Sequence, residues 1–199
     1  LADCPLLIVR ESPTGRPGLT LIGARGSGGR VAGHLQSLGQ ELGLEKLDDE
    51  SFEVLRIEAG TPVFGRDVTE RNFPQEIGRD DRAINFVKGC YLGQETVARI
   101  DALGHVNQIL KGLQLEPDAP AAEPGSVLEA DGAGAGFITS SAVSPGWKRA
   151  IALAMVRTSL ARPGVSLVVK GKGDEATALV RATVCDLPMI PPPGAVPPH

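Results

Sequence analysis

The chain has 199 residues, of which 42% are hydrophobic and 22% are charged, and its formal net charge is −4 with a pI near 5.4. This length allows one sizeable domain or two small ones, and the composition is typical of a globular protein. An acidic chain without a basic stripe disfavours direct binding to nucleic acid. No apolar run approaches the roughly 20 residues that cross a bilayer, and no signal peptide opens the chain. We therefore expect a cytoplasmic protein with no membrane partner.

The N-terminal part is predicted to contain a hairpin followed by a helix. Residues 5–10 and 19–22 are short apolar runs on either side of a turn rich in Pro and Gly, a pattern typical of paired strands. The helix is predicted to place four apolar side chains on one face and to end at Gly43. These side chains are Val31, Leu35, Leu38 and Leu42.

A second helix is predicted to begin near Asp48, Asp49 or Ser51, which are all suitable N-caps, and to end at Gly60. Its inward face is predicted to carry Phe52, Leu55 and Ala59. In this interpretation Arg56 and Glu58 point away from that face, toward solvent.

Residues 88–95, KGCYLGQE, are the most informative stretch. They follow an apolar run at 83–87 and precede apolar residues at helical spacing, so we predict a strand-to-helix turn. Cys90 would lie beside Lys88 and near the unpaired N–H groups of a helix start, and both lower a cysteine pKa. Cys90 is therefore the candidate reactive thiolate, with Lys88 as its activating neighbour. The alternative from the residues alone is a buried cysteine that fills apolar space.

The chain has three cysteines, Cys4, Cys90 and Cys185, which are widely separated. None stands in a Cys-x-x-Cys or Cys/His spacing. This argues against a disulfide framework and against a metal site formed by this chain alone.

Three sequence blocks carry a resemblance to a known family. KGCYLGQE, followed by TVAR at 96–99, resembles the signature of the YgfZ proteins, folate-binding relatives of the glycine cleavage T-protein (aminomethyltransferase). RIEAGTPVFGRD at 56–67 resembles the R-x-E-x-G…G-x-D segment shared by both, and PQE at 74–76 resembles the P-x-E that follows it. The resemblance is strong over residues 50–105. Compared with that family, a portion on the order of a hundred residues is expected to precede Leu1.

The resemblance implies a bound tetrahydrofolate or a derivative. Arg56 is the candidate for holding the carboxylate tail of the folate, because a guanidinium binds carboxylates in a bidentate manner. A structural ion pair is the alternative for Arg56, and stabilisation of a helix dipole is the alternative for Glu95. The further candidate folate contacts are Glu58, Asp67, Gln94, Glu95 and Arg99.

Six short strands are predicted after residue 104, at 109–115, 126–129, 135–139, 150–156, 165–169 and 178–184. Separated by Pro- and Gly-rich turns, they indicate a small antiparallel barrel or sandwich. This agrees with the C-terminal barrel of the T-protein-like family, and GFITS…SPG at 136–146 resembles one of its elements. Residues 188–199 contain six prolines and are predicted to be loosely attached.

The predicted fold class is therefore α+β. Residues 1–107 are the remnant of a T-protein-like folate-binding domain, residues 108–187 form a small antiparallel β-barrel, and a Pro-rich tail follows.

The resemblance implies a folate-binding accessory protein that supports iron–sulfur cluster assembly or repair, and so iron–sulfur-dependent tRNA modification. Its partners would be iron–sulfur proteins or cluster-assembly factors. The hypothesis is that the cleft between the two domains holds the folate while Cys90 is an exposed thiol of low pKa. Two alternatives stay open. One is an aminomethyltransferase of the glycine cleavage system, which would need a pterin-holding carboxylate and an upstream aspartate. The other is a structural or regulatory module.

Overall fold

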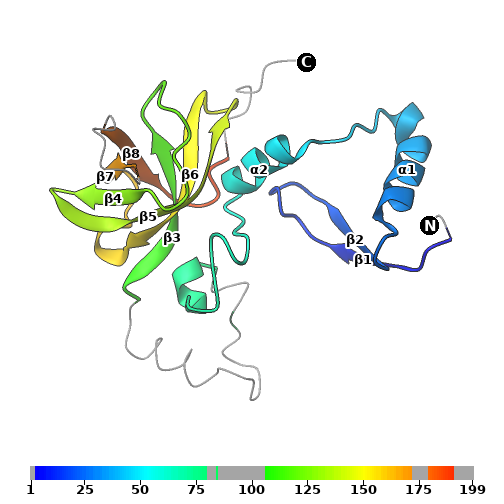
Figure 1. Cartoon of the computed structure of the whole chain (residues 1–199), viewed down its shortest axis with the longest axis horizontal. Coiled ribbons are helices and arrows are strands. Elements are labelled where there is room, and N and C mark those ends of the chain that lie inside the picture. The colour runs from blue at the N-terminus through cyan, green and yellow to red at the C-terminus, as the bar shows by residue number, and fades with distance from the viewer. Residues whose placement is uncertain (1–2, 80–83, 85–105, 172–178, 191–199) are drawn as a thin grey trace.

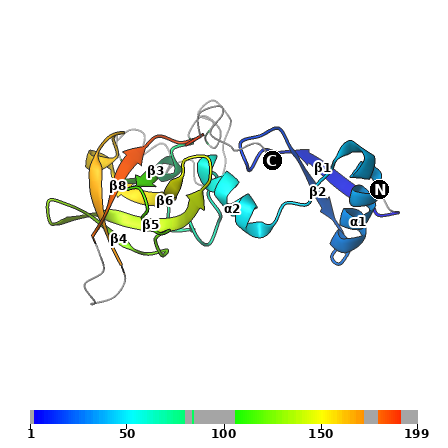
Figure 2. The same ribbon diagram turned by 90° about the horizontal axis from the view of Figure 1, so that it is seen from above.

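The computed structural model describes residues 3–79, 84, 106–171 and 179–190. The molecule is elongated, with a β-barrel at one end and a hairpin with its helix at the other (Figures 1 and 2). Helix α2, Asp49–Glu58, lies between these two parts. None of the helices in the described ranges is long and apolar enough to cross a bilayer.

The hairpin pairs β1, Leu6–Arg10, with β2, Leu19–Gly23, in antiparallel register. Helix α1, Gly28–Gly39, continues into the short 3-10 helix η1, Gln40–Leu42, which ends at Gly43 in the left-handed conformation. These elements are where the sequence predicts them. Few of their side chains are buried, and Leu7 and Ile8 of β1 are 61% and 59% exposed. Local pairing therefore holds this end of the molecule together more than a core does.

Helix α2 begins at the predicted cap, because the Asp48 carboxylate accepts a hydrogen bond from the Ser51 backbone N–H at 2.6 Å. This hydrogen bond lowers the pKa of Asp48. The predicted inward face is wrong in part, because Phe52 is 42% exposed whereas Arg56 and Glu58 are buried. The helix packs on β5 and β6, and the barrel presents polar partners there, so polar residues face inward.

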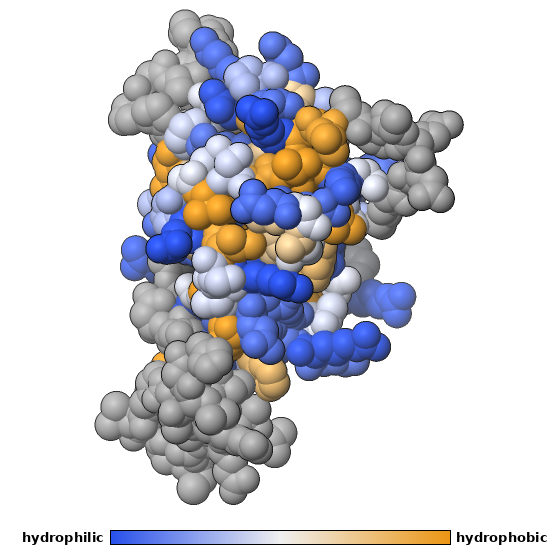
Figure 3. Space-filling view, turned by 90° about the vertical axis from the view of Figure 1, so that its left-hand side faces the viewer, coloured by the Kyte–Doolittle hydropathy of each residue, from blue (hydrophilic) through white to orange (hydrophobic). Residues whose placement is uncertain are grey.

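Six strands close into an antiparallel barrel in the order β3-β6-β5-β4-β7-β8. The predicted α+β fold with a C-terminal barrel is confirmed. The strands are β3 (Gln108–Leu115), β4 (Val127–Ala130), β5 (Ala133–Ser144), β6 (Arg149–Arg157), β7 (Ser166–Lys170) and β8 (Val180–Cys185). The surface at the barrel end shows apolar residues broken up by hydrophilic ones (Figure 3).

Strand β6 is buried on both faces, which explains its unbroken apolar sequence. Successive side chains of a strand point to opposite faces. Ala150, Ala152 and Ala154 belong to the cluster that fills the barrel, whereas Leu153 and Met155 belong to a second cluster with Ile57 of α2 and Met189. The small residues therefore occupy the narrow interior, and the large ones attach α2 to the outside of the barrel.

The start of the predicted Pro-rich tail has one residue packed on the barrel, Met189, whereas Ile190 is 52% exposed. Met189 is only 3% exposed. Its N–H donates to the Glu58 carbonyl at 2.6 Å, and its own carbonyl accepts from the Trp147 indole N–H at 2.9 Å. Gly112 of β3 leaves room for Met189, since a Cβ at that position would collide with the Met189 side chain. Residues 191–199 lie outside the described part of the chain.

Gly136 offers a test of barrel closure. Its φ is +150°, and a Cβ there would collide with the Met155 carbonyl on the neighbouring strand. We expect Gly136→Ala to lower the free energy of unfolding by at least about 2 kcal/mol in urea titrations. Gly134→Ala in the same strand meets no atom within 4 Å and should change it by less than about 0.5 kcal/mol. Equal losses in the two variants would show that Gly136 is not required by the close approach of β6.

Candidate functional site

The predicted site residues divide into two groups. Lys88, Cys90, Gln94, Glu95 and Arg99 lie outside the described residues, so their predicted roles stay predictions. Arg56, Glu58 and Asp67 lie within the described part, and all three are buried where α2 meets the barrel.

Arg56 donates all five of its N–H groups within the chain. Its side chain is 1% exposed, and its Nη1 contacts the Asp67 carboxylate at 2.7 Å. Nη1 also donates to the Thr61 carbonyl at 3.1 Å, and Nη2 donates to the Ser140 hydroxyl at 2.6 Å. The remaining N–H groups, on Nε and Nη2, go to the two carboxylate oxygens of Glu53. The prediction that Arg56 faces solvent is therefore wrong.

The Asp67 carboxylate is fully buried and accepts four hydrogen bonds. Oδ2 accepts hydrogen bonds from the Arg56 guanidinium and from the Val63 N–H, the latter at 2.8 Å. Oδ1 accepts hydrogen bonds from the hydroxyls of Thr139 and Ser140, each at 2.6 Å. Neighbouring residues of a regular strand point to opposite faces, so one carboxylate oxygen could not normally accept from both hydroxyls. The register of β5 against β6 shifts between Ile138 and Ser140, and this bulge brings both hydroxyls to Asp67.

Glu58 forms a second link between α2 and the barrel. Its Oε1 accepts a hydrogen bond from the Ser144 hydroxyl at 2.5 Å. The oxygen of that hydroxyl in turn accepts a hydrogen bond from the backbone N–H of Trp147 at 3.1 Å. Glu58 is 9% exposed, so its predicted solvent-facing position is also wrong. Arg56 and Glu58 can both face the barrel because hydroxyl and carboxylate partners satisfy their polar atoms there.

Ligand binding by these three residues stays a prediction. Arg56 could grip a folate carboxylate only by exchanging one of its five hydrogen bonds for the ligand. The structural ion pair, the alternative drawn from the sequence, describes the contacts that Arg56 makes in this structure.

A pocket of about 490 Å³ lies beside this interface. Its lining comes from the hairpin turn, the end of α2, the 3-10 helix η2 (Pro74–Ile77) with Arg79, the start of β3, and the segment after β8. Gly60 adopts φ +67°, and a Cβ there would lie 2.8 Å from the Leu187 side chain. This close approach brings the end of α2 onto the C-terminal segment, so both predicted domains contribute walls to one pocket.

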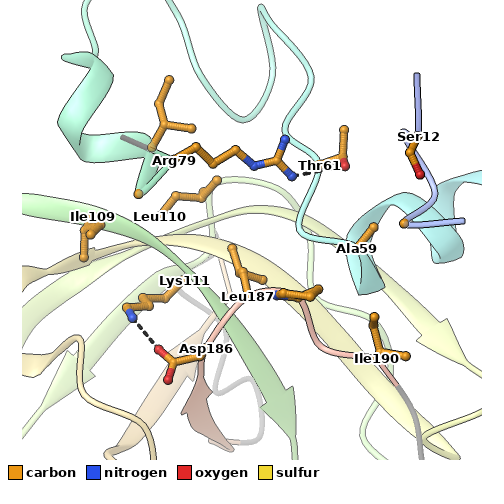
Figure 4. Close-up of a pocket in the computed structure, with 14 residues that line it drawn as sticks. Ser12, Ala59, Thr61, Arg79, Ile109, Leu110, Lys111, Asp186, Leu187 and Ile190 are labelled. Atoms are coloured by element: carbon orange, nitrogen blue, oxygen red, sulfur yellow. Dashed lines mark hydrogen bonds and ion pairs between the residues drawn. The ribbon is translucent and has the colours of Figure 1, made fainter. Parts of the chain in front are cut away.

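The pocket combines apolar walls with three charged side chains. Arg79 donates from Nη2 to the Gly60 carbonyl at 2.8 Å and to the Thr61 hydroxyl at 3.2 Å, and Lys111 pairs with Asp186 at 2.6 Å (Figure 4). The apolar lining includes Ile77, Ile109, Leu110, Leu187 and Ile190. The lining therefore exposes both polar and apolar surface, with more of the polar kind, and the volume lies in the range of small-molecule sites.

Sequence reasoning missed Arg79, Lys111 and Asp186 as pocket residues. No motif marks them, because Lys111 and Asp186 are far apart in the chain and meet only where β3 pairs with β8. Thr139, Ser140 and Ser144 lie in the GFITS…SPG element, but the sequence alone does not identify their carboxylate partners.

The described cysteines do not have the features predicted for Cys90. Cys4 is buried. Cys185 is partly buried, and burial raises the pKa of its thiol, with the nearby Asp186 carboxylate raising it further. Among the described residues, no group of His, Cys, Asp and Glu side chains is arranged to hold a metal ion.

Comparisons with known proteins identify the barrel. Residues 109–190 match the family described as the glycine cleavage T-protein C-terminal barrel domain. The chain is 32% identical over 184 residues to the aminomethyltransferase of Synechococcus sp. (strain RCC307), a match that covers 88% of this chain and 47% of the relative. The aminomethyltransferase of Streptomyces avermitilis is 31% identical over 175 residues, covering 83% of this chain and 45% of the relative.

The fold of the chain is similar to that of a solved aminomethyltransferase structure. The crystal structure of glycine cleavage system aminomethyltransferase T from Bartonella henselae superposes with a TM-score of 0.77 at 21% identity, over 92% of this chain and 49% of that one. The barrel is thus a T-protein C-terminal barrel domain. Beyond the barrel, the chain is similar to the aminomethyltransferases named above and spans about half the length of the curated relatives that it matches.

The Asp67 network yields a stability prediction. Asp67→Asn keeps the shape of the side chain but removes the buried charge that faces Arg56. The substitution weakens four buried hydrogen bonds at once and leaves Arg56 with Glu53 as its remaining carboxylate partner, so we expect a loss of about 3 kcal/mol in urea unfolding. Glu129→Gln breaks the more exposed pair with Lys170 and should cost less than about 1 kcal/mol. A loss for Asp67→Asn as small as that for Glu129→Gln would contradict a central structural role of Asp67.

The lowered pKa of Glu53 makes the free energy of unfolding depend on pH. Hydrogen bonds from Arg56 hold the pKa of Glu53 below its ordinary value, opposed in part by burial. The carboxylate therefore stabilises the folded chain above its unfolded pKa of about 4.3, and this contribution disappears as the pH falls through the lower folded value. The stability difference between wild type and Glu53→Gln should shrink as the pH falls from 6 to 3, whereas Glu45→Gln, at an exposed position, should follow wild type. A difference that does not change with pH would rule out this contribution.

Proposed function

We propose that this chain belongs to a folate-binding protein of the YgfZ type, which supports iron–sulfur cluster assembly or repair and, through it, iron–sulfur-dependent tRNA modification. The observation that carries the proposal is the KGCYLGQE run at 88–95 in a chain whose barrel is of the T-protein type. Cys90 is the proposed working thiol, and Lys88 is the cation that favours its thiolate. Of the thiol and thiolate forms of cysteine, the thiolate is the one that acts as a nucleophile and binds metal ions. It therefore suits a protein that interacts with iron–sulfur partners.

The pocket supports the folate part of the proposal. Its volume of about 490 Å³ falls in the range of small-molecule sites, and its lining comes from both predicted domains. Apolar walls such as Ile109 and Leu187 suit an aromatic portion of a ligand, and the cations Arg79 and Lys111 suit a carboxylate, so these residues fit a folate. Tetrahydrofolate supplies a reduced pterin that accepts one-carbon units. The residues that we propose for the remainder of the ligand site are Gln94, Glu95 and Arg99.

Alkylation of Cys90 as a function of pH tests the thiol. We expect a reactivity pKa well below the value of about 8.5 for a model thiol. The background should be low, because Cys4 is buried and burial raises the pKa of Cys185. Cys90→Ser should remove the fast phase, and Cys185→Ser should leave it. A reactivity pKa at or above 8.5 would remove the physical basis for a reactive Cys90.

A second candidate function is aminomethyl transfer, favoured by the names of the relatives that match most of this chain. The two candidates predict different results in a glycine cleavage assay that is reconstituted with tetrahydrofolate. Methylene transfer that survives Cys90→Ser would favour the aminomethyltransferase. Binding of tetrahydrofolate without transfer favours the YgfZ-type function, and absence of heat in calorimetry with tetrahydrofolate would favour a structural or regulatory module.

A further inference from the structure

The ion pair between Lys111 and Asp186 in the pocket is unequal in its exposure. The Lys111 side chain is 18% exposed, whereas that of Asp186 is 67% exposed, and the two meet at 2.6 Å. A largely solvated carboxylate loses little when its ion pair breaks, because water replaces the lysine. A mostly buried ammonium, by contrast, needs another anionic or polar partner when its carboxylate leaves.

The backbone on both sides of Asp186 is held in place. Cys185 pairs with Gly112 of β3, and Met189 is tied to the carbonyl of Glu58 and to the indole of Trp147. The backbone therefore holds Asp186 beside Lys111, while the exposed Asp186 side chain can still rotate into solvent. Lys111 itself lies on a barrel strand and is equally fixed.

The charged residues of the described lining have different partners. Arg79 is hydrogen-bonded to the Gly60 carbonyl and the Thr61 hydroxyl, and Lys111 is paired with Asp186. If Asp186 turns to solvent, the Lys111 ammonium loses its carboxylate partner beside a lining that includes Ile109, Leu110 and Leu187. A ligand that complements this pocket has an apolar body and an anionic group.

We propose that the pocket binds an amphipathic organic carboxylate whose charged group replaces Asp186 on the Lys111 ammonium. Asp186 is then a residue that determines specificity. Its carboxylate pairs with Lys111 when no ligand is present, and only a ligand with an anionic group can replace it in that ion pair. A neutral ligand leaves the Lys111–Asp186 pair intact and gains nothing from Lys111.

Two sources supply such a carboxylate. One is the 4-aminobenzoylglutamate end of a folate, in which case the inference rests on the proposed function. The other is a free aliphatic acid. The probes are therefore N-(4-aminobenzoyl)-L-glutamate and octanoate, each titrated into the whole chain by calorimetry, with tetrahydrofolate as a third titrant.

We expect Asp186→Asn to bind at least one probe about two- to fivefold more tightly than wild type, because the internal competitor is gone. Lys111→Met should weaken the same probe by at least about tenfold, because a charge-assisted hydrogen bond is lost. Glu129→Gln, which breaks the Lys170 pair away from the pocket, is the matched control and should bind as wild type does. Tighter binding of the aminobenzoyl probe alone points to a folate, and tighter binding of octanoate alone points to an aliphatic acid.

Equal affinity of wild type, Asp186→Asn and Lys111→Met would overturn the inference, as would absence of binding by both probes at millimolar concentration. These outcomes are distinct from failure of the proposed function. Tetrahydrofolate that binds all three variants equally supports the folate assignment and contradicts the exchange at Lys111. Octanoate that follows the expected order without any binding of tetrahydrofolate supports the exchange and contradicts the folate assignment.

Discussion

The rest of this structure depends on the buried ion pair between Arg56 and Asp67. Neither charge is accessible to water, so each must be satisfied by the protein, and the partners come from three separate segments. Helix α2 supplies Arg56, the turn at 63–67 supplies Asp67, and β5 supplies the hydroxyls of Thr139 and Ser140. A shift of any one segment would leave a buried charge without a partner. The network therefore determines how α2 sits on the barrel.

The pocket is a consequence of this arrangement. Once α2 is attached to the barrel, its C-terminal end meets the segment after β8, and Gly60 allows Leu187 to approach closely. The Glu58 carbonyl and Trp147 then hold Met189, which anchors the segment that supplies Leu187, Pro188 and Ile190 to the pocket. The hairpin turn completes one wall, which makes the pocket a junction of both predicted domains. A ligand bound there would contact the hairpin end and the barrel end of the molecule at once.

Two of the three motif blocks have different relations to function. The block at 56–67, which resembles a segment shared by the YgfZ and T-proteins, provides buried contacts between α2 and the barrel. It also contributes Ala59 and Thr61 to the lining of the pocket. The block that contains Cys90 carries the proposed thiol chemistry. A folding role for the first block is compatible with a ligand role for the second, because a fixed interface is what positions a neighbouring site.

Local patterns were enough to predict the hairpin, both described α-helices and the six barrel strands, because alternation, helical spacing, caps and Pro- or Gly-rich turns depend on neighbouring residues. The family resemblance likewise rests on short blocks that are read directly from the chain. Only the tertiary structure decided which face of α2 is buried, since Arg56 and Glu58 can face inward only where Asp67 and the hydroxyls of β5 are placed to bind them. It also decided that Met189 is packed and that Lys111 meets Asp186, because strand pairing between β3 and β8 brings together residues that no local pattern connects.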